Sequence, residues 1–324
     1  MTPPRSSTTT LTRDDFDRIE RLRTGFLDDA RGDAALSDYW RDDADLRAYD
    51  RVLAARIGWK WDAALAECRD RGMVRTDTAT VLDYGCGSGV AARRYVAAFG
   101  AGSVLCHDRS ARAMAFAVQQ LRAELPTVAA RTQHSLGTLQ PDVLLVSHVL
   151  AELDARGEAE LLALIARSKT VVLVEPGAHR TARRLAVLRG KLLATHRIVA
   201  PCPHAGACPS LHNGNDWCHF FAEPPPHVFT EAFWAHASRE LHIDLRALPY
   251  SFLALQREAS TVAPPENRVL GRPEISPHTA RVQVCTEPGL RMADVTKRHD
   301  AALWKRLKKD PATVRSVPPT TLRG

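Results

Sequence analysis

The stretch VLDYGCGSG, residues 81–89, decides the fold of this 324-residue chain. A short apolar run passes through an acidic residue, Asp83, into a turn that holds Gly85, Gly87 and Gly89. Glycines let the backbone come close to a ligand and take dihedral angles that other residues avoid. A helix that follows such a turn offers free amide groups at its N-terminus. The pattern predicts a strand, turn and helix at the carboxyl edge of an open parallel sheet, where such sheets bind ligands.

The chain after this stretch alternates apolar runs with helical patterns. SVLCHD (103–108), PDVLLVSHVL (141–150) and KTVVLVEPG (169–177) are typical of strands buried on both faces of a parallel sheet. Helical spacing indicates helices between them, and a basic helix is expected over 179–199. Later patterns indicate a helix over 230–240, a strand near 248–257 and a hairpin with a Pro-Gly turn over 281–297. This alternation predicts an α/β fold with a doubly wound, Rossmann-like sheet.

The domain organisation follows from these patterns and from composition. Apolar residues recur at helical spacing before residue 76, which predicts a helical cap. We expect a flexible tail over 1–12, an N-terminal helical cap over 13–75, a Rossmann-like core over 76–200, a Cys-rich insertion over 201–228, the remainder of the core with a C-terminal hairpin over 229–300, and a basic tail over 301–324.

Composition limits the classes of partner. The chain is 45% hydrophobic and 25% charged, as in ordinary globular proteins, and its net charge of +7 favours an anionic partner, usually nucleic acid. An Arg-rich and Ala-rich composition without such a partner is the alternative. No apolar run approaches the roughly 20 residues of a membrane span, so no membrane partner is expected. The leader is short and soon acidic, which favours the bacterial cytoplasm, with the mitochondrial matrix as the alternative.

The glycine turn predicts a particular cofactor. Its spacing is GxGxG, with an acid two residues before the first glycine, rather than the GxGxxG of dinucleotide sites. That arrangement suits S-adenosylmethionine, whose amino group is cationic. Asp108 ends the second strand, where an acid can accept hydrogen bonds from both ribose hydroxyls. We therefore expect the cofactor to be bound by these residues: Asp83, Gly85, Gly87, Gly89, Asp108 and Ser147. A tight structural turn without ligand is the alternative.

The sequence specifies the catalytic residues less clearly than the cofactor site. Ser147 and His148 end the strand at 141–150, where methyltransferases place cofactor-side or substrate-side groups. His148 is a candidate general base or a packed histidine. The chain reads SHVL at 147–150 in place of the Asp/Asn-Pro-Pro-Tyr/Phe motif of many RNA and DNA amino-methyltransferases, so the catalytic residues stay unknown. Cys86, within the glycine turn, is interpreted as a small filler rather than a nucleophile.

A cysteine cluster points to metal. Cys202, Cys208 and Cys218 lie within the irregular segment PCPHAGACPSLHNGNDWCHF (201–220), and Cys285, on the expected hairpin, could reach them. Four thiolates suit either Zn²⁺ or an iron–sulfur cluster. The spacing lacks the CxxC knuckles of structural zinc sites. The histidines that could replace a thiolate and so keep Zn²⁺ open are His204, His212 and His219. Unrelated thiols in a loop are the alternative.

Together these residues resemble the Rsm22 family of small-ribosomal-subunit proteins, which includes bacterial proteins, the yeast mitochondrial small-subunit protein and an animal methyltransferase-like assembly factor. VLDYGCGSG, VVLVEPG with its basic helix, PCPHAGACP…WCHF and Cys285 carry the resemblance over roughly residues 40–300. It implies a Rossmann methyltransferase fold and association with the small subunit or its rRNA. It also implies a 4Fe–4S site on four cysteines: Cys202, Cys208, Cys218 and Cys285.

Three functions follow as hypotheses. The first is an S-adenosylmethionine-dependent rRNA methyltransferase with a structural cluster, in which the 179–199 helix and Lys305, Arg306, Lys308 and Lys309 contact phosphates. The second is a non-catalytic assembly factor that binds rRNA and uses the cluster as a structural or redox element. The third is a small-molecule methyltransferase with a zinc site. Away from the ribosome we expect a monomer.

Overall fold

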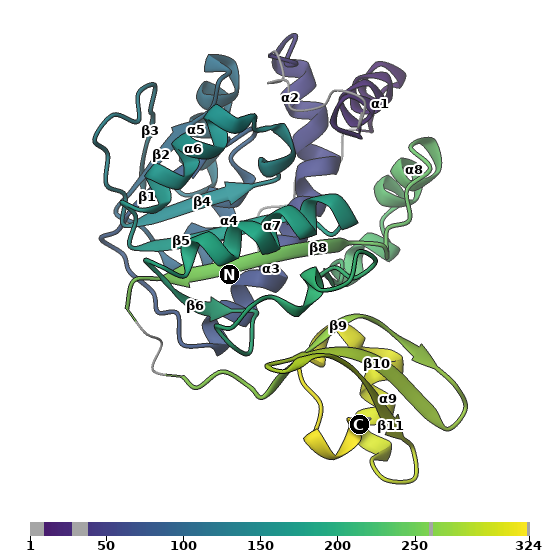
Figure 1. Cartoon of the computed structure of the whole chain (residues 1–324). Coiled ribbons are helices and arrows are strands. Elements are labelled where there is room, and N and C mark those ends of the chain that lie inside the picture. Colours follow the sequence, from purple (N-terminus) through teal and green to yellow (C-terminus); the bar gives the residue numbers. More distant parts are fainter. Residues whose placement is uncertain (1–9, 28–37, 259–261, 323–324) are drawn as a thin grey trace.

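The computed structural model describes residues 10–27, 38–258 and 262–322 (Figure 1). The expected tail lies mostly outside these residues. Helices of the N-terminal part are α1 (Arg13–Leu27), α2 (Asp43–Tyr49) and α3 (Ala55–Asp70), with the π-helical η2 (Asp50–Ala54) between the last two. Within the described residues, no helix is both long and apolar enough to cross a membrane.

An eight-stranded sheet forms the centre of the main domain. Its strands are β1 (Thr80–Tyr84), β2 (Ser103–His107), β3 (Ala129–Thr132), β4 (Val143–Ser147), β5 (Thr170–Pro176), β6 (Arg197–Ala200), β7 (Phe220–Phe221) and β8 (Pro249–Gln256). The order is β3-β2-β1-β4-β5-β8-β6, with β7 paired to β8. Strands β1 to β5 are parallel, and β8 runs antiparallel to its neighbours. The predicted Rossmann-like α/β sheet is confirmed by this strand order, with β1 and β4 at the switch point where such sheets bind ligands.

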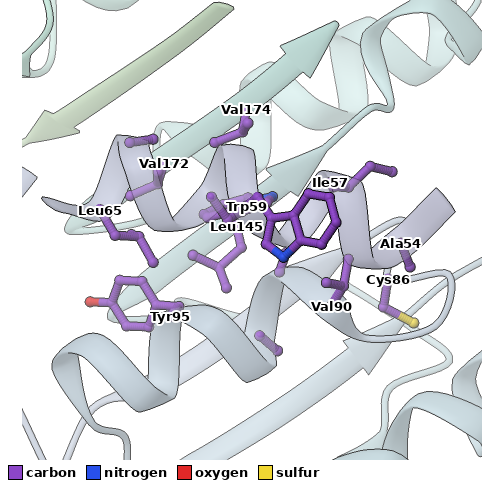
Figure 2. Close-up of a cluster of buried hydrophobic side chains, with 14 of the residues drawn as sticks. Ala54, Ile57, Trp59, Leu65, Cys86, Val90, Tyr95, Leu145, Val172 and Val174 are labelled. Carbon is purple, nitrogen blue, oxygen red and sulfur yellow. The ribbon is translucent and has the colours of Figure 1, made fainter. Parts of the chain in front are cut away.

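Helices cover both faces of this sheet. They are α3, α4 (Val90–Phe99), α5 (Ala111–Glu124), α6 (Ala155–Ile165) and α7 (His179–Leu192). Helix α8 (Ala232–Glu240) lies beside α3, where Trp234 contacts Trp59. Alternate strand residues such as Val81 and Leu145 pack against α3, α4 and α5, whereas Leu82 and Leu144 pack against α6 and α7. Figure 2 shows the first of these cores, with Cys86 among its apolar side chains. That position fits a small filler.

The C-terminal part forms a second, smaller body beside the main sheet (Figure 1). It consists of β9 (Asn267–Ile275), β10 (Thr279–Thr286), β11 (Gly289–Thr296) and α9 (Ala301–Lys309). Every second residue of β10 is buried, because Val282 and Val284 pack against Leu303, Trp304 and Leu307 of α9. We call residues 262–322 the C-terminal module. The expected hairpin therefore belongs to a separate three-stranded sheet rather than to the Rossmann core.

The expected helix over 179–199 is too long. Helix α7 ends at Leu192, and residues Arg197–Ala200 form β6, which pairs with β8. The β-branched Ile198 and Val199 favour an extended backbone, and the residue before Pro201 is restrained to it. The local residues therefore specify a strand at the end of the expected helix.

Candidate functional site

The glycine turn forms an open cradle at the end of β1. Gly85, Gly87 and Gly89 have φ angles of 69°, 50° and 79°, in the left-handed region that favours glycine. A Cβ at Gly85 would lie 2.5 Å from Cγ2 of Val149, and one at Gly89 would lie 2.9 Å from the Cβ of Ala117. At Gly87, no heavy atom of the described residues lies within 4 Å of that position, apart from the glycine itself and its two chain neighbours. The turn is therefore packed at both ends and open in the middle.

Asp108 is fixed against this turn. Its Oδ2 accepts a hydrogen bond from the Gly87 amide at 3.0 Å, and its Oδ1 accepts one from the Ser110 amide at 2.9 Å. The amides of Gly85 and Cys86 both donate to the His107 carbonyl, at 2.8 and 3.0 Å. Burial raises the pKa of the Asp108 carboxyl. These hydrogen bonds hold the ends of β1 and β2 together, and they place the Asp108 carboxylate beside the glycine turn.

Asp83 carries a buried carboxyl oxygen without a partner. Its side chain is 0% exposed, and its Oδ2 accepts from the Ala92 amide of α4 at 3.2 Å. Among the described residues nothing hydrogen-bonds its Oδ1. Burial raises the pKa of this carboxyl to about 7. A cationic group near the turn would stabilise the ionised form and satisfy the unpaired oxygen, and this fits the amino group of S-adenosylmethionine.

Ser147 and His148 stand at the end of β4. The Ser147 hydroxyl accepts a hydrogen bond from Nε1 of Trp61 at 2.9 Å, which ties it to α3. His148 has a φ of 56°, which is rare outside glycine and occurs where surrounding structure holds the backbone. Its Nε2 is buried without a partner in the described part of the chain, and burial lowers its pKa well below the usual value. Burial therefore favours the neutral imidazole, whose uncommitted nitrogen is available for a hydrogen bond.

Glu175 is a polar residue that the sequence interpretation missed. It lies at the end of β5 and is 0% exposed. Its Oε1 accepts from the amides of Val149 and Leu150, at 3.0 and 3.2 Å, whereas its Oε2 has no partner among the described residues. Burial raises the pKa of this carboxyl to about 8. An acid at the end of the apolar run VVLVE was the signal that could have found it.

The four predicted cysteines line one cavity. Cys202 and Cys208 come from the loop after β6, Cys218 precedes β7, and Cys285 lies on β10 with its side chain on the face opposite α9. The cavity among them has a volume of about 20 Å³, enough for roughly one water molecule, and it is partly open to solvent. Of the three alternative histidines, His204 lines the cavity, with Nε2 at 3.6 Å from Sγ of Cys285. His212 is exposed, and His219 stacks on Trp217.

These thiols do not converge on one point. Among the described residues, no group of three or more His, Cys, Asp or Glu side chains is arranged to hold a metal ion. The expected metal-binding insertion is therefore present as a loop whose thiols share a cavity, and its metal stays a prediction. Burial raises the pKa of the Cys285 thiol to about 12 and also raises the pKa of Cys202 and Cys218.

Buried arginines surround the cavity. Arg189 of α7 is 3% exposed and donates from Nε to Sγ of Cys202 at 3.2 Å, from Nη1 to the Gly206 carbonyl at 2.9 Å and from Nη2 to the His204 carbonyl at 2.7 Å. Arg268 is buried as well and pairs with Glu67 at 3.0 and 2.8 Å. A third buried arginine, Arg71, donates to the Pro201 carbonyl at 3.1 Å. Buried cations thus outnumber the buried acid, so the cavity favours an anionic occupant.

The chain matches the sequence model of a family described as the mitochondrial small ribosomal subunit protein Rsm22, over residues 63–311. It belongs to the Rsm22 family. The match spans the glycine turn, the cysteine loop and β10, so this Rsm22 family member has both candidate sites within the shared region. No curated protein matches the chain.

Solved structures give distant likenesses. The magnesium protoporphyrin IX methyltransferase of Synechocystis, solved with S-adenosylhomocysteine, is 16% identical, with a TM-score of 0.39 over 76% of this chain and 95% of that one. An rRNA methylase of Streptococcus thermophilus is 10% identical, with a TM-score of 0.36 over 60% of this chain and 95% of that one. The strand order described above, rather than these likenesses, defines the fold.

Proposed function

We propose that this Rsm22 family member is an S-adenosylmethionine-binding, methyltransferase-like protein that acts on, or assembles, the small ribosomal subunit through its rRNA. The cradle after β1 carries the proposal: it is open at Gly87 and lies near the unpaired, buried Oδ1 of Asp83. An α/β sheet with a glycine turn at its switch point is a site for a nucleotide-like ligand.

The cofactor residues have distinct roles in this proposal. Asp83 meets the cationic amino group, the backbone of Gly85, Gly87 and Gly89 lies against the cofactor, and Asp108 accepts from the ribose. When bound, the cofactor supplies an electrophilic methyl group. Ser147 borders the site, and the uncommitted Nε2 of His148 is the candidate acceptor for a proton from the substrate.

Titration calorimetry with S-adenosylmethionine tests the cofactor. We expect wild-type protein to bind and Asp83→Asn to bind at least about tenfold more weakly, because a charge-assisted hydrogen bond is lost. Asp77→Asn is the matched control, since Asp77 is an exposed acid that pairs with Arg75. Absence of wild-type binding at millimolar cofactor would reject the proposal.

We propose further that Cys202, Cys208, Cys218 and Cys285 hold a structural 4Fe–4S cluster. The four thiols surround a volume, and a cluster takes each thiolate on a different iron atom, whereas Zn²⁺ draws four ligands to one point. The excess of buried arginine favours the net negative charge that four thiolates give to either group. Anaerobic purification followed by iron, sulfide and zinc analysis decides: stoichiometric zinc without sulfide would reject the cluster.

A non-catalytic assembly factor is the second candidate. It is favoured by the SHVL sequence at 147–150 and by the Ser147 hydroxyl, which is already bound by Trp61. Transfer of tritium from labelled cofactor into small subunits separates the two functions. A methyltransferase labels subunits from a deletion strain more strongly than mature subunits, whereas an assembly factor labels neither.

Location and oligomeric state stay proposals. We propose the bacterial cytoplasm, and the mitochondrial members for which the family is named support the mitochondrial matrix as the alternative. We expect a monomer away from the ribosome, which light scattering on the purified chain would test.

A further inference from the structure

Exposed cations gather on one face of the C-terminal module. This face, which we call the α9 basic face, consists of Lys297, Arg298, Lys305, Arg306, Lys308 and Lys309, all exposed. Helix α9 buries Leu303, Trp304 and Leu307 against the small sheet, so its cations occupy the opposite side. The outward side of this helix is therefore strongly basic.

The module carries most of the chain's excess charge. Residues 262–322 hold 11 Lys and Arg against six Asp and Glu, whereas the whole chain holds 44 against 37. Several of the module's other cations already have acidic partners: Arg268 pairs with Glu67, Arg281 with Asp294 and Arg315 with Asp70. Apart from the exposed Arg272 and Arg291, the α9 basic face thus supplies the cations of the module that remain for an external anion.

Two lysines of this face lie over the ring of Trp304, which the helix buries against the small sheet. Nζ of Lys297 and Nζ of Lys308 lie 5.3 and 5.2 Å from the ring centroid of Trp304. Asp300, the neighbouring acid, is occupied as the helix cap, since its Oδ1 accepts from the Leu303 amide at 2.8 Å. Both ammonium groups therefore add positive charge to the same part of the face, where an anion can bind.

We propose that the α9 basic face binds the phosphate backbone of double-helical RNA. The inference rests on the proposed link to rRNA and specifies where contact is made. Lysine ammonium groups bind phosphates as point charges and read no sequence. Within the described residues, this face exposes no Phe, Tyr or Trp ring on which an unpaired base could stack. Double-helical RNA, which is recognised largely through its phosphates and sugars, is therefore the fitting partner.

The test is salt-dependent binding of full-length protein to a fluorescent RNA hairpin. The variant Lys305→Gln/Lys308→Gln/Lys309→Gln removes three charges from the face. Its matched control, Arg47→Gln/Arg131→Gln/Arg156→Gln, removes three exposed charges from α2, β3 and α6. Because all six side chains are exposed, we expect both variants to keep the wild-type melting temperature.

The face variant is expected to bind at least about tenfold more weakly and to lose about three units of slope in log Kd against log salt. The control keeps most of the wild-type affinity and slope. Equal losses in the two variants would overturn the proposal, as would tighter wild-type binding to an unpaired strand of the same length. If wild-type protein bound no RNA, the rRNA link itself would fail together with this inference, whereas calorimetry with the cofactor would still report on the cradle.

Discussion

Helices α7 and α9 are both rich in arginine and lysine, but the charged groups of α7 bind partners within the protein, whereas those of α9 are exposed to solvent. On α7, Arg183 and Arg189 donate to the cysteine loop, and Arg184 and Lys191 pair with Glu158. On α9, the four cations between Lys305 and Lys309 are exposed. The basic helix that the sequence marks as a phosphate-binding element is thus largely committed inside the protein.

The position of each basic residue relative to the buried side of its helix, rather than the number of charges, distinguishes the two helices. Ala182, Leu185 and Leu192 form the buried stripe of α7, and Arg189 lies on that same stripe at helical spacing. On α9 the buried positions are Leu303, Trp304 and Leu307, and no cation shares them. A basic residue on an apolar stripe therefore indicates an internal partner. A basic residue off the stripe can have either a partner within the protein, as Arg183 does, or a free surface, as Lys305 does.

The largest expected effect is that of Arg189→Gln. The substitution removes the donor to the Cys202 thiol and to the carbonyls of His204 and Gly206, which leaves buried acceptors unpaired. We expect the free energy of unfolding to fall by about 3 kcal/mol and the iron content to fall with it. Urea denaturation and metal analysis measure both. An effect as small as that of Lys305→Gln, expected within about 0.5 kcal/mol, would break the comparison.

We expect the second-largest effect on stability from Arg183→Gln. Nη1 of Arg183 donates to the carbonyls of Ser210, Asn213 and Asp216, each at 2.8 Å, so it holds the loop without touching a thiol. Because Arg183 is half-buried, we expect a loss of about 1 to 2 kcal/mol in unfolding free energy. Hydrogen exchange of the loop amides should quicken. If the exchange rates of these amides stayed unchanged, Arg183 would not hold the loop, and the role assigned to the basic residues of α7 would be wrong.

Much of the fold could be predicted, because the apolar runs at 81–84, 103–107, 143–147 and 170–176 specify buried parallel strands. The second sheet was not predicted, since the hairpin pattern of 281–297 does not state which body it joins. The cysteines could be grouped by spacing, and the alternation of β10 places Cys285 on the face opposite α9. The burial of Arg71, Arg189 and Arg268 depends on packing between distant segments, which local patterns do not contain.

Asp83, like Arg189, carries its ionisable group inside the protein. Its folded pKa of about 7 lies above the usual value of an unfolded Asp, so its contribution to stability is full below about pH 4 and is lost as pH rises through 7. Ionised Asp83 is the form that would attract the cofactor's amino group. We expect affinity for S-adenosylmethionine to rise about eightfold from about pH 6 to 7.5, in step with the ionised fraction of Asp83. Calorimetry across this range measures it, and a rise that persists in Asp83→Asn would assign the titration elsewhere.

The smallest effect is expected from Arg184→Gln/Lys191→Gln, and it sharpens the comparison most directly. Both cations lie on α7, and both pair with Glu158 at distances of 3.0 and 2.8 Å, in partly exposed positions. Such pairs contribute little, so unfolding free energy should change by less than about 1 kcal/mol. RNA affinity should also change little, because both cations are held against Glu158, whose carboxylate offsets one of the two positive charges. Binding to the same RNA hairpin measures this, and a loss comparable to that of the α9 variant would show that α7 also contacts phosphates and that charge alone was a sufficient guide.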